Sequence, residues 1–217
     1  MQQHSKLFAS LVLGAAIVVT ALAVTRQVLA VAGEADAARW KGDILAYVAV
    51  KNPQAPIKAF QKFPDTLIAE AQRTNIDHCL ALALAEVESE FRHDLVGSAG
   101  EIGIFQVLPS TAALFESSVG AFRRPTITKA KRDLGDLSEP TVSTRFAMAY
   151  LRDILKRKPA IRDALTEYNG GPAGRHPQYY RMVMGAYVEI LERAELRCRY
   201  REVPKKPAPL LAGMVRM

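Results

Sequence analysis

The sequence predicts a mostly α-helical protein with one globular domain and at most a very small β element. Apolar residues recur at helical spacing in several segments, most clearly from Ile76 to Phe91. Pro and Gly clusters separate these segments, and the strand-like run from Ile102 to Leu108 is short. No repeat is apparent at any period.

Length and composition fit one ordinary domain with appendages. The chain has 217 residues, of which 49% are apolar and 24% charged. We expect a signal peptide or membrane anchor over residues 1–32, a stalk or linker over 33–63, the folded domain over 64–200, and a disordered tail over 201–217. The net charge is +7, but the basic residues are spread along the chain without a long arm. This distribution disfavours nucleic-acid binding.

The amino-terminal part predicts export. Residues 7–24 carry no charge, as in an export signal or a transmembrane anchor. Small-x-small cleavage patterns occur at residues 21–23 and 30–32, so the segment is either cleaved or retained as an anchor. Either way we expect the domain outside the inner membrane, in the periplasm or cell envelope. The breaker Asn52-Pro-Gln-Ala-Pro56 then interrupts the predicted stalk.

The central helix starts near Ile76, with Asp77 placed to cap it. Advancing about 100° per residue places four apolar residues within about 40° of one direction. These residues are Leu80, Leu84, Val87 and Phe91. We expect this stripe to face the core.

Three glutamates follow on this helix, and only one lies near the apolar stripe. Glu88 falls about 80° from Leu80, whereas Glu86 and Glu90 fall on the far side. Partial burial disfavours the charged form of a carboxyl and raises its pKa, which suits a general acid. Helix geometry alone leaves two interpretations open. Glu88 is either a catalytic acid or a structural acid that flanks the core and pairs with an arginine.

The sequences of the remaining segments predict turns and helices. A turn at residues 97–100 leads to the strand-like run, in which Gln106 is set among apolar residues. Helices are expected from Pro109, over 140–156, over 161–168 and over 179–197, in each case with an apolar face or a proline start. The loop over 119–140 is basic, and we favour solvated charges there over contacts to a polyanion.

Cysteine and histidine positions exclude several classes of site. Cys79 and Cys198 either pair as a disulfide in an exported chain, or Cys79 is a small buried apolar residue. The four histidines show no metal-ligand spacing, and no phosphate-binding loop, dinucleotide fingerprint or serine elbow is present. We expect neither a metal nor a cofactor.

Several motifs in order resemble the soluble-lytic-transglycosylase family, lysozyme-like enzymes that cut peptidoglycan. The family carries Glu-Ser at a helix end, here Glu88-Ser89. Its pattern Gly-Ala-x-Gly-Leu-Met-Gln-x-Met-Pro-x-Thr-Ala corresponds to Gly100-Glu-Ile-Gly-Ile-Phe-Gln-Val-Leu-Pro-Ser-Thr-Ala112. A later helix corresponds to residues 139–151, and Ala-Tyr-Asn-x-Gly-x-Gly appears as Glu167-Tyr-Asn-Gly-Gly-Pro-Ala-Gly174. Tyr179, Val183 and Tyr187 match the closing motif. The resemblance covers roughly residues 64–195 and implies a helical fold related to goose-type lysozyme.

A few positions depart from the family pattern. The family usually has Ser nine residues after the catalytic Glu, where this chain has Gly97. The neighbouring Ser98 either takes over that contact or the contact is lost. Phe105 replaces the usual Met and keeps an apolar surface. Ser143 and Ala147 replace Asn and Gly, which affects helix packing.

The resemblance implies a lytic transglycosylase with Glu88 as its single catalytic carboxyl. Such an enzyme cleaves the β-1,4 bond between N-acetylmuramic acid and N-acetylglucosamine and closes a 1,6-anhydro ring. Peptidoglycan glycan strands would be the substrate, opened locally in the cell wall. Family position further suggests a set of residues that line the substrate site: Ser89, Ser98, Phe105, Gln106, Tyr168 and Asn169. Tyr168 would hold either the Glu88 carboxyl or the sugar.

Three other functions remain compatible with the sequence. One is a lysozyme-type hydrolase on the same fold. A second is a non-catalytic assembly component of an envelope-spanning machine, which the intact Glu88, Gln106 and Tyr168 disfavour. A third is a partner of a secretion or conjugation system, a role compatible with catalysis.

Overall fold

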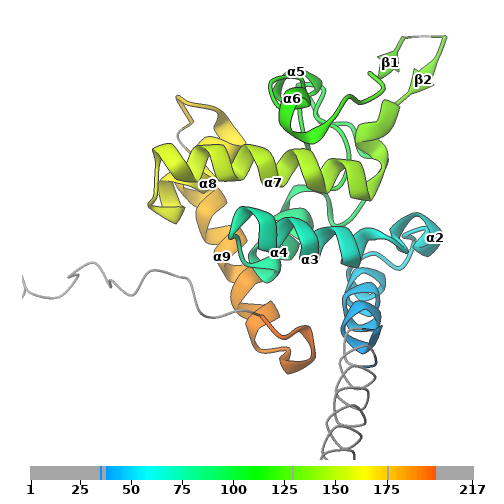
Figure 1. Ribbon diagram of the computed structural model, residues 1–217. Coiled ribbons are helices and arrows are strands. Elements are labelled where there is room, and N and C mark those ends of the chain that lie inside the picture. Colours follow the sequence, from blue (N-terminus) through cyan, green and yellow to red (C-terminus); the bar gives the residue numbers. More distant parts are fainter. Residues whose placement is uncertain (1–34, 36–37, 129, 175, 199–217) are drawn as a thin grey trace, which may run out of the picture. The chain divides into compact units, whose positions relative to one another are not determined.

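The computed structural model describes residues 35, 38–128, 130–174 and 176–198 (Figure 1). These residues belong to two compact units, residues 1–42 and 43–217. In the first unit, residues 38–42 are helical. The predicted export segment over residues 7–24 and the tail over 201–217 lie outside the described residues. Among the described helices, none has both the length and the apolar character needed to span a membrane.

The second unit begins with four helical segments. Residues 43–51 are helical, and α2 (Ile57–Phe60), α3 (Phe63–Thr74) and α4 (His78–Ser89) follow. Pro64 lies in the first turn of α3, where its missing N–H costs nothing. Asp77 caps α4 by accepting a hydrogen bond from the Cys79 backbone N–H at 3.0 Å, as predicted.

A region of short elements follows α4. It contains α5 (Pro109–Ala113), α6 (Glu116–Val119), the strands β1 (Thr126–Ile127) and β2 (Arg132–Asp133), and the 3₁₀ helix η1 (Gly135–Ser138). The two strands pair antiparallel, with Thr126 opposite Asp133. We expected the β element at Ile102 to Leu108. Instead a turn at residues 103–106 interrupts that run, and only isolated bridges join Ile102 to Val96 and Val107.

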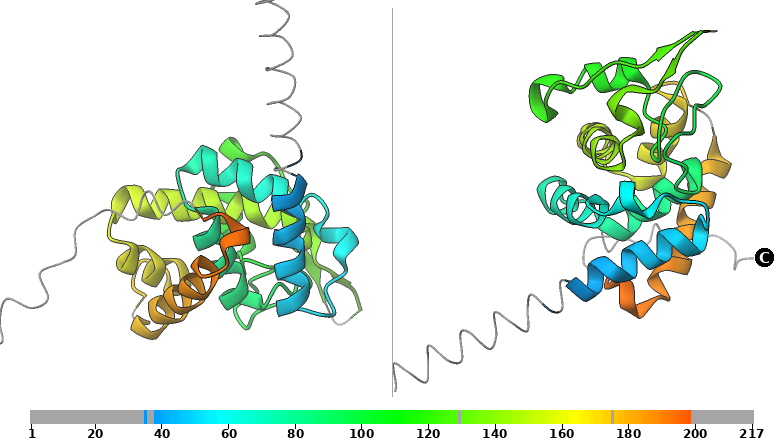
Figure 2. Two further views of the ribbon diagram at one scale, coloured as in Figure 1. Left: turned by 90° about the horizontal axis from the view of Figure 1, so that it is seen from below. Right: turned by 90° about the vertical axis from the view of Figure 1, so that its right-hand side faces the viewer.

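Three longer helices complete the second unit. They are α7 (Pro140–Arg157), α8 (Ile161–Gly170) and α9 (Pro177–Leu191), followed by η2 (Ala194–Leu196). α4 packs chiefly on α9, and α3 packs chiefly on α7 (Figure 1). Figure 2 shows the same pairs from two other directions. The prediction of a mostly helical domain with a very small sheet is confirmed.

The predicted stalk over residues 33–63 differs from the structure in its second half. Ile44, Val48, Phe60 and Phe63 are fully buried in the second unit. The helical residues 43–51 (blue in Figure 2) lie against α4, where the Tyr47 hydroxyl donates a hydrogen bond to Glu86. Apolar residues in the segment that we expected to be a stalk therefore form part of the core. The folded unit begins about twenty residues earlier than expected.

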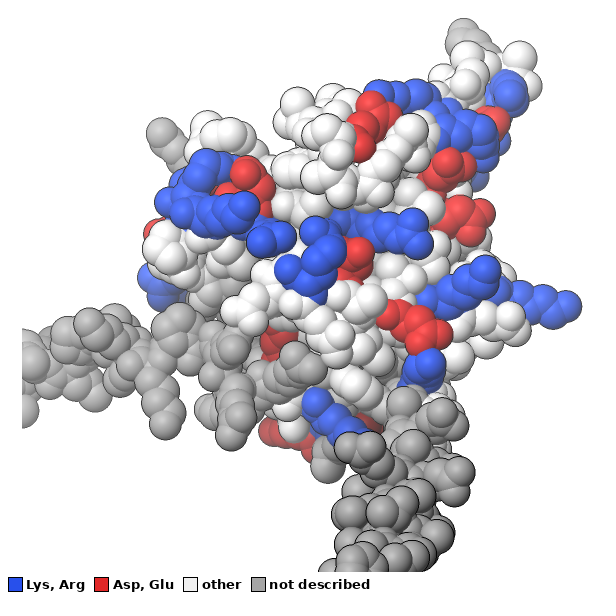
Figure 3. Space-filling view, viewed as in Figure 1, with Lys and Arg blue, Asp and Glu red and all other residues white. Residues whose placement is uncertain are grey.

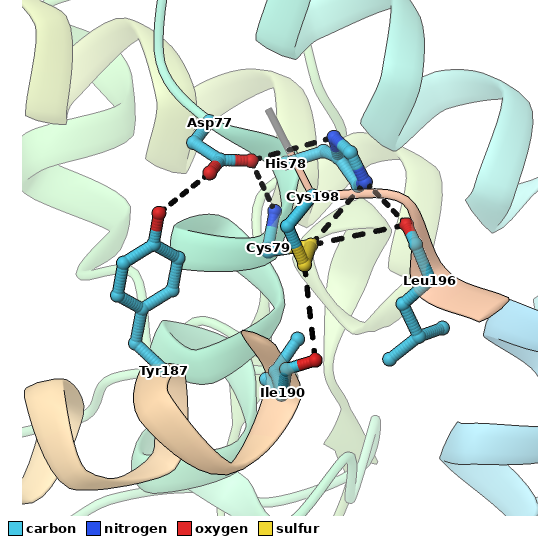
Figure 4. The surroundings of a disulfide bond; sticks show 7 residues. All are labelled: Asp77, His78, Cys79, Tyr187, Ile190, Leu196 and Cys198. Carbon is cyan, nitrogen blue, oxygen red and sulfur yellow. Dashed lines mark hydrogen bonds and ion pairs between the residues drawn. A yellow bond between two sulfur atoms is a disulfide. The ribbon is translucent and has the colours of Figure 1, made fainter. Parts of the chain in front are cut away.

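A disulfide between Cys79 and Cys198 closes the fold. It joins the start of α4 to the segment after η2 (Figure 4). His78 lies beside it and contacts the Leu196 carbonyl oxygen through Nε2 at 3.0 Å. On the other side, the Tyr187 hydroxyl donates to Asp77 Oδ2 at 2.6 Å. The amino end of α4 is thus fixed to the last two elements of the chain.

Several charged side chains of the described residues form ion pairs. On the face in Figure 3, most basic groups lie next to acidic ones. In the basic loop, Arg123 pairs with Asp133 and Asp136, and Arg124 pairs with Glu116 at 2.8 Å. These exposed pairs contribute little to stability. They also satisfy the charges of this loop without a polyanion.

Candidate functional site

The end of α4 presents Glu88. The helix stops at Glu90, whose φ of 52° is left-handed, and the Glu90 N–H bonds to the Glu86 carbonyl oxygen at 2.7 Å. The helix is buried on all sides over residues 81–85, whereas Leu80 and Val87 are only half-buried. The predicted stripe was therefore wrong at these two positions. The prediction that Glu88 lies at the margin of the buried surface agrees with its intermediate exposure.

The Glu88 carboxyl is held by a hydrogen bond from another helix. The Tyr179 hydroxyl, from α9, donates a hydrogen bond to Glu88 Oε1. Burial raises the pKa of Glu88 to about 7, although the Tyr179 hydrogen bond acts in the opposite direction. The negative charge of Glu101 also contributes to this raised pKa, as the smallest of the three effects. A carboxyl with a pKa near neutrality can both give and take a proton.

The other two glutamates of α4 have different surroundings. Glu86 accepts hydrogen bonds from Tyr47 and forms an ion pair with Lys51 Nζ at 2.5 Å. Glu90 is exposed to solvent. Both therefore lie away from Glu88, as the helix geometry predicted.

Ser89 is a core residue in this structure. Its side chain is 2% exposed, and its hydroxyl donates to the Ile104 carbonyl oxygen at 2.9 Å and to Ala85 at 3.1 Å. It joins α4 to the loop that follows residue 100. We expected Ser89 to contact substrate, but burial and backbone partners give it a structural role instead.

The loop over residues 97–106 folds beside Glu88. Gln106 has a left-handed φ of 47°, and its Nε2 donates to the carbonyl oxygens of Gly103 and Leu95 at 2.9 and 3.3 Å. Gly103 is required there, since a Cβ would lie 2.2 Å from the Leu137 carbonyl oxygen and φ is +80°. Of the other predicted site residues, Ser98 is exposed, whereas Phe105 is fully buried. The expectation that the Phe105 ring contacts substrate does not fit this position.

The predicted residues of α8 divide in the same way. The Tyr168 hydroxyl donates to the Phe105 carbonyl oxygen at 3.0 Å, so it holds the loop rather than the Glu88 carboxyl. Its ring lies 5.3 Å from that of Tyr150. Asn169 is exposed in the last turn of α8. The structure thus brings Glu88, Gln106 and Tyr168 into one region through the same loop.

Glu167, next to Tyr168, is a buried acid that the sequence did not single out. Arg157 and Lys158, at the end of α7, each contact its carboxylate at 2.8 Å. Burial acts to raise the pKa of Glu167, but the two cations outweigh it and leave that pKa below its usual range. These ion pairs join α8 to the end of α7 and so help to hold the helix that carries Tyr168 in place.

One group of described residues has metal-ligand atoms close together. The ligand atoms of Asp77, His78 and Cys79 lie within 4.8 Å of one another. The Cys79 sulfur is bonded to Cys198, however, and is not a thiolate (Figure 4). The arrangement fits a cap and a disulfide better than a metal centre.

The comparison with protein families is decisive. Residues 65–181, more than half of the chain, match the family described as "Transglycosylase SLT domain". The chain belongs to this family. Membership agrees with the expected lysozyme-like helical fold, and the matched range contains Glu88, Gln106, Tyr168 and Tyr179. No curated protein matches the chain.

Solved structures of larger proteins are also similar to this family member. An inactive mutant of lytic transglycosylase Slt from Pseudomonas aeruginosa shares 22% identity over 66% of this chain and 26% of that one, with a TM-score of 0.49. The 70 kDa soluble lytic transglycosylase from Escherichia coli shares 21% over 73% and 25%, with a TM-score of 0.41. A complex of the 70 kDa soluble lytic transglycosylase with bulgecin A gives 20% identity, the same coverages and a TM-score of 0.40. The transglycosylase-domain chain spans about a quarter of the length of these proteins.

Sequence reasoning missed two residues at the site. Tyr179 was noted only as a match to the closing motif, yet its hydroxyl bonds to Glu88. Glu101 was part of the quoted loop motif but had no predicted role. The available signal was that Glu101 stands where the quoted family pattern has alanine.

Proposed function

We propose that this chain is a lytic transglycosylase of peptidoglycan, with Glu88 as its catalytic acid and base. The observation that carries the proposal is the state of Glu88 in a member of the transglycosylase SLT family. Its carboxyl is largely buried, is held by Tyr179 and has a pKa of about 7. A carboxyl with a pKa in this range can act both as an acid and as a base near neutral pH.

The reaction needs two proton transfers, and Glu88 takes part in both. The Glu88 carboxyl gives its proton to the oxygen of the β-1,4 bond between N-acetylmuramic acid and N-acetylglucosamine, and the bond from that oxygen to C1 breaks. The N-acetyl oxygen of the substrate supports the positive charge at C1. The Glu88 carboxylate then takes the proton of the C6 hydroxyl, whose oxygen bonds to C1. The 1,6-anhydro ring closes without consuming water.

The surroundings of Glu88 support this single-carboxyl chemistry. Glu86 is engaged by Lys51 and Tyr47, so it is not available as a partner acid. The Tyr179 hydroxyl fixes the orientation of the Glu88 carboxyl, and orientation of a reacting group contributes strongly to rate. Gln106 Oε1 and the exposed Asn169 and Ser98 are the polar groups we assign to sugar contacts nearby.

The product identifies the reaction. Purified chain is incubated with peptidoglycan, and the fragments are analysed by mass spectrometry. We expect 1,6-anhydromuramoyl ends, and we expect Glu88→Gln to abolish their formation. Glu90→Gln, an exposed carboxyl two residues away, is the matched control and should retain activity. Cleavage by the Glu88→Gln variant at the normal rate would disprove the role of Glu88.

A lysozyme-type hydrolase is the second candidate, and Glu101 favours it. A second carboxylate near the acid is what an inverting glycosidase uses to activate water. Such an enzyme would leave reducing muramoyl ends, which differ from anhydro ends by the mass of one water. The same mass spectra therefore separate the two reactions.

The biological setting follows from the substrate. Because peptidoglycan lies in the cell envelope, we infer that the enzyme acts in the periplasm and opens the wall locally. Service to a secretion or conjugation machine, and anchorage through residues 7–24, are extensions of this proposal. Fractionation of cells with antibody against the folded domain tests them: recovery with the inner membrane supports anchorage, and release in the soluble periplasmic fraction contradicts it.

A further inference from the structure

A second carboxylate, Glu101, lies in the loop beside Glu88. In the family pattern quoted above, the corresponding residue is alanine. The Glu101 charge is near enough to Glu88 to act on its ionisation. Glu101 has no role in the single-carboxyl mechanism, and it is not part of α4.

The loop geometry places the Glu101 side chain over Gly97. The Gly97 N–H donates to the Glu101 carbonyl oxygen at 2.8 Å, and the Gly100 N–H donates back to the Gly97 carbonyl oxygen at 3.1 Å. In this closed turn, Glu101 Oε2 accepts a hydrogen bond from the Ala99 N–H at 2.9 Å. The carboxylate is thus folded back into its own turn.

The space beside Gly97 is therefore occupied. A Cβ at residue 97 would lie 2.3 Å from Glu101 Oε2 and 2.7 Å from Gln106 Oε1, both far closer than ordinary contact. The obstacle is formed by side-chain ends and not by backbone. Glycine at 97 and glutamate at 101 are two parts of one arrangement, in which the carboxylate takes the place of a side chain at residue 97.

Glu101 carries a charge with no cationic partner among the described residues. In the part of the chain that the structure describes, no Lys, Arg or His forms an ion pair with Glu101. The groups that face Glu88 are Tyr179 from α9, Tyr168 from α8 and Glu101 from the loop. Both tyrosines are neutral near pH 7, since burial raises their pKa values further. Glu101 is accordingly the one charge among these three groups.

We propose that Glu101 is a positioning residue for Glu88, whose carboxylate fills the space beside Gly97 and presents a second negative charge to the catalytic acid. This inference rests on the proposed function of Glu88. A negative charge nearby disfavours ionisation of the Glu88 carboxyl. Glu101 therefore keeps the Glu88 proton in place at a pH where burial alone would retain it less well.

The first test is the pH dependence of kcat/KM on soluble peptidoglycan fragments, for the full chain and for Glu101→Gln. We expect the alkaline limb to move to lower pH by about half a unit to one unit. Activity then falls roughly three- to tenfold at pH 8 and less than twofold at pH 5.5. Glu90→Gln, the exposed control, should keep the wild-type profile. An equal loss at every pH, or a change in KM alone, would overturn the proposal in favour of a structural or substrate-contact role.

The second test does not depend on activity. The Glu88 carboxyl carbon is followed by NMR titration in the wild type and in Glu101→Gln. We expect a lower pKa of Glu88 in the variant, and an unchanged value would overturn the proposal. Because this readout needs only folded protein, it separates the two ideas. If Glu88→Gln still cleaves glycan, the proposed function fails; if it does not and the titration is unchanged, only the inference about Glu101 fails.

The third test uses the shared space. The test is a double-mutant cycle of Gly97→Ser, Glu101→Ala and the double variant. The product yield and the melting temperature of each variant are measured. Gly97→Ser alone should lose activity, because its Cβ displaces Glu101, whereas the double variant should lose less than the two single variants combined. Additive losses would contradict a shared space.

Discussion

The Tyr179 hydroxyl donates a hydrogen bond to Glu88 Oε1, across 91 residues of chain. This contact links α9 to the end of α4, two helices that also pack extensively along their lengths. The hydrogen bond also affects the ionisation of Glu88. A donor to the carboxylate favours the charged form, so Tyr179 opposes the effect of burial on Glu88.

We predict that Tyr179→Phe raises the pKa of Glu88 and misorients its carboxyl. The alkaline limb of kcat/KM should move to higher pH, opposite to the shift expected for Glu101→Gln. We also expect a loss of roughly ten- to a hundredfold in kcat. The measurement is a pH series of product formation, with Tyr180→Phe as the neighbouring control. A shift to lower pH would contradict the assigned hydrogen bond.

Glu88 should also reduce stability at alkaline pH. Its pKa is about 7 in the folded chain against an ordinary 4.5, so the folded state binds more protons between these values. Stability therefore falls as pH rises through this window, by about 3 kcal/mol at most. Glu88→Gln should melt at the same temperature as wild type near pH 4.5 and at a higher temperature at pH 8. Equal melting temperatures at both pH values would refute the burial of the charge.

Ser89 and Ser98 should differ although both were expected at the substrate. Ser89→Ala leaves the Ile104 carbonyl oxygen without its donor, which costs about 1–3 kcal/mol of unfolding free energy. Ser98 is exposed, so Ser98→Ala should change stability by less than about 0.5 kcal/mol. Urea denaturation of the two variants measures this directly. A stable Ser89→Ala protein with impaired substrate binding would restore the original expectation.

The disulfide should stabilise the folded unit substantially. Cys79 and Cys198 are 119 residues apart, and closing a long loop restricts the unfolded chain. We expect the double variant Cys79→Ser/Cys198→Ser to lose about 2–5 kcal/mol. Wild-type protein with and without reductant gives a parallel measurement. Unfolding curves that do not change with reductant would show that the bond contributes little.

Local patterns allowed most elements to be predicted. The helical spacing placed Glu88 at the margin of the core, and Asp77 caps α4 as its residue type suggested. Residues 81–85 are buried on all sides, beyond the predicted stripe, because α3, α9 and residues 43–51 pack around α4. Leu80 and Val87, by contrast, are less buried than the stripe predicted. A single sequence carries no signal for how many neighbours a helix has.

Long-range partners explain the remaining differences. The motif placed Tyr168 and Tyr179 near the site, but only the packing of α8 and α9 decides which hydroxyl reaches Glu88. Ser89 and Phe105 lie in motifs with the right order, yet their side chains point into the core. Residues 43–63 were predicted as part of a stalk, and their burial depends on a surface that other segments form.

The close approach of Glu101 to residue 97 also restricts how this sequence can change. A Cβ at 97 and a carboxylate at 101 compete for one volume, so the effect of either replacement depends on the residue already present at the other position. Exchange toward serine at 97 becomes tolerable once residue 101 is small, and the reverse order passes through a crowded intermediate. The cost of mutational routes between this loop and the common family loop should therefore depend on the order of the two replacements.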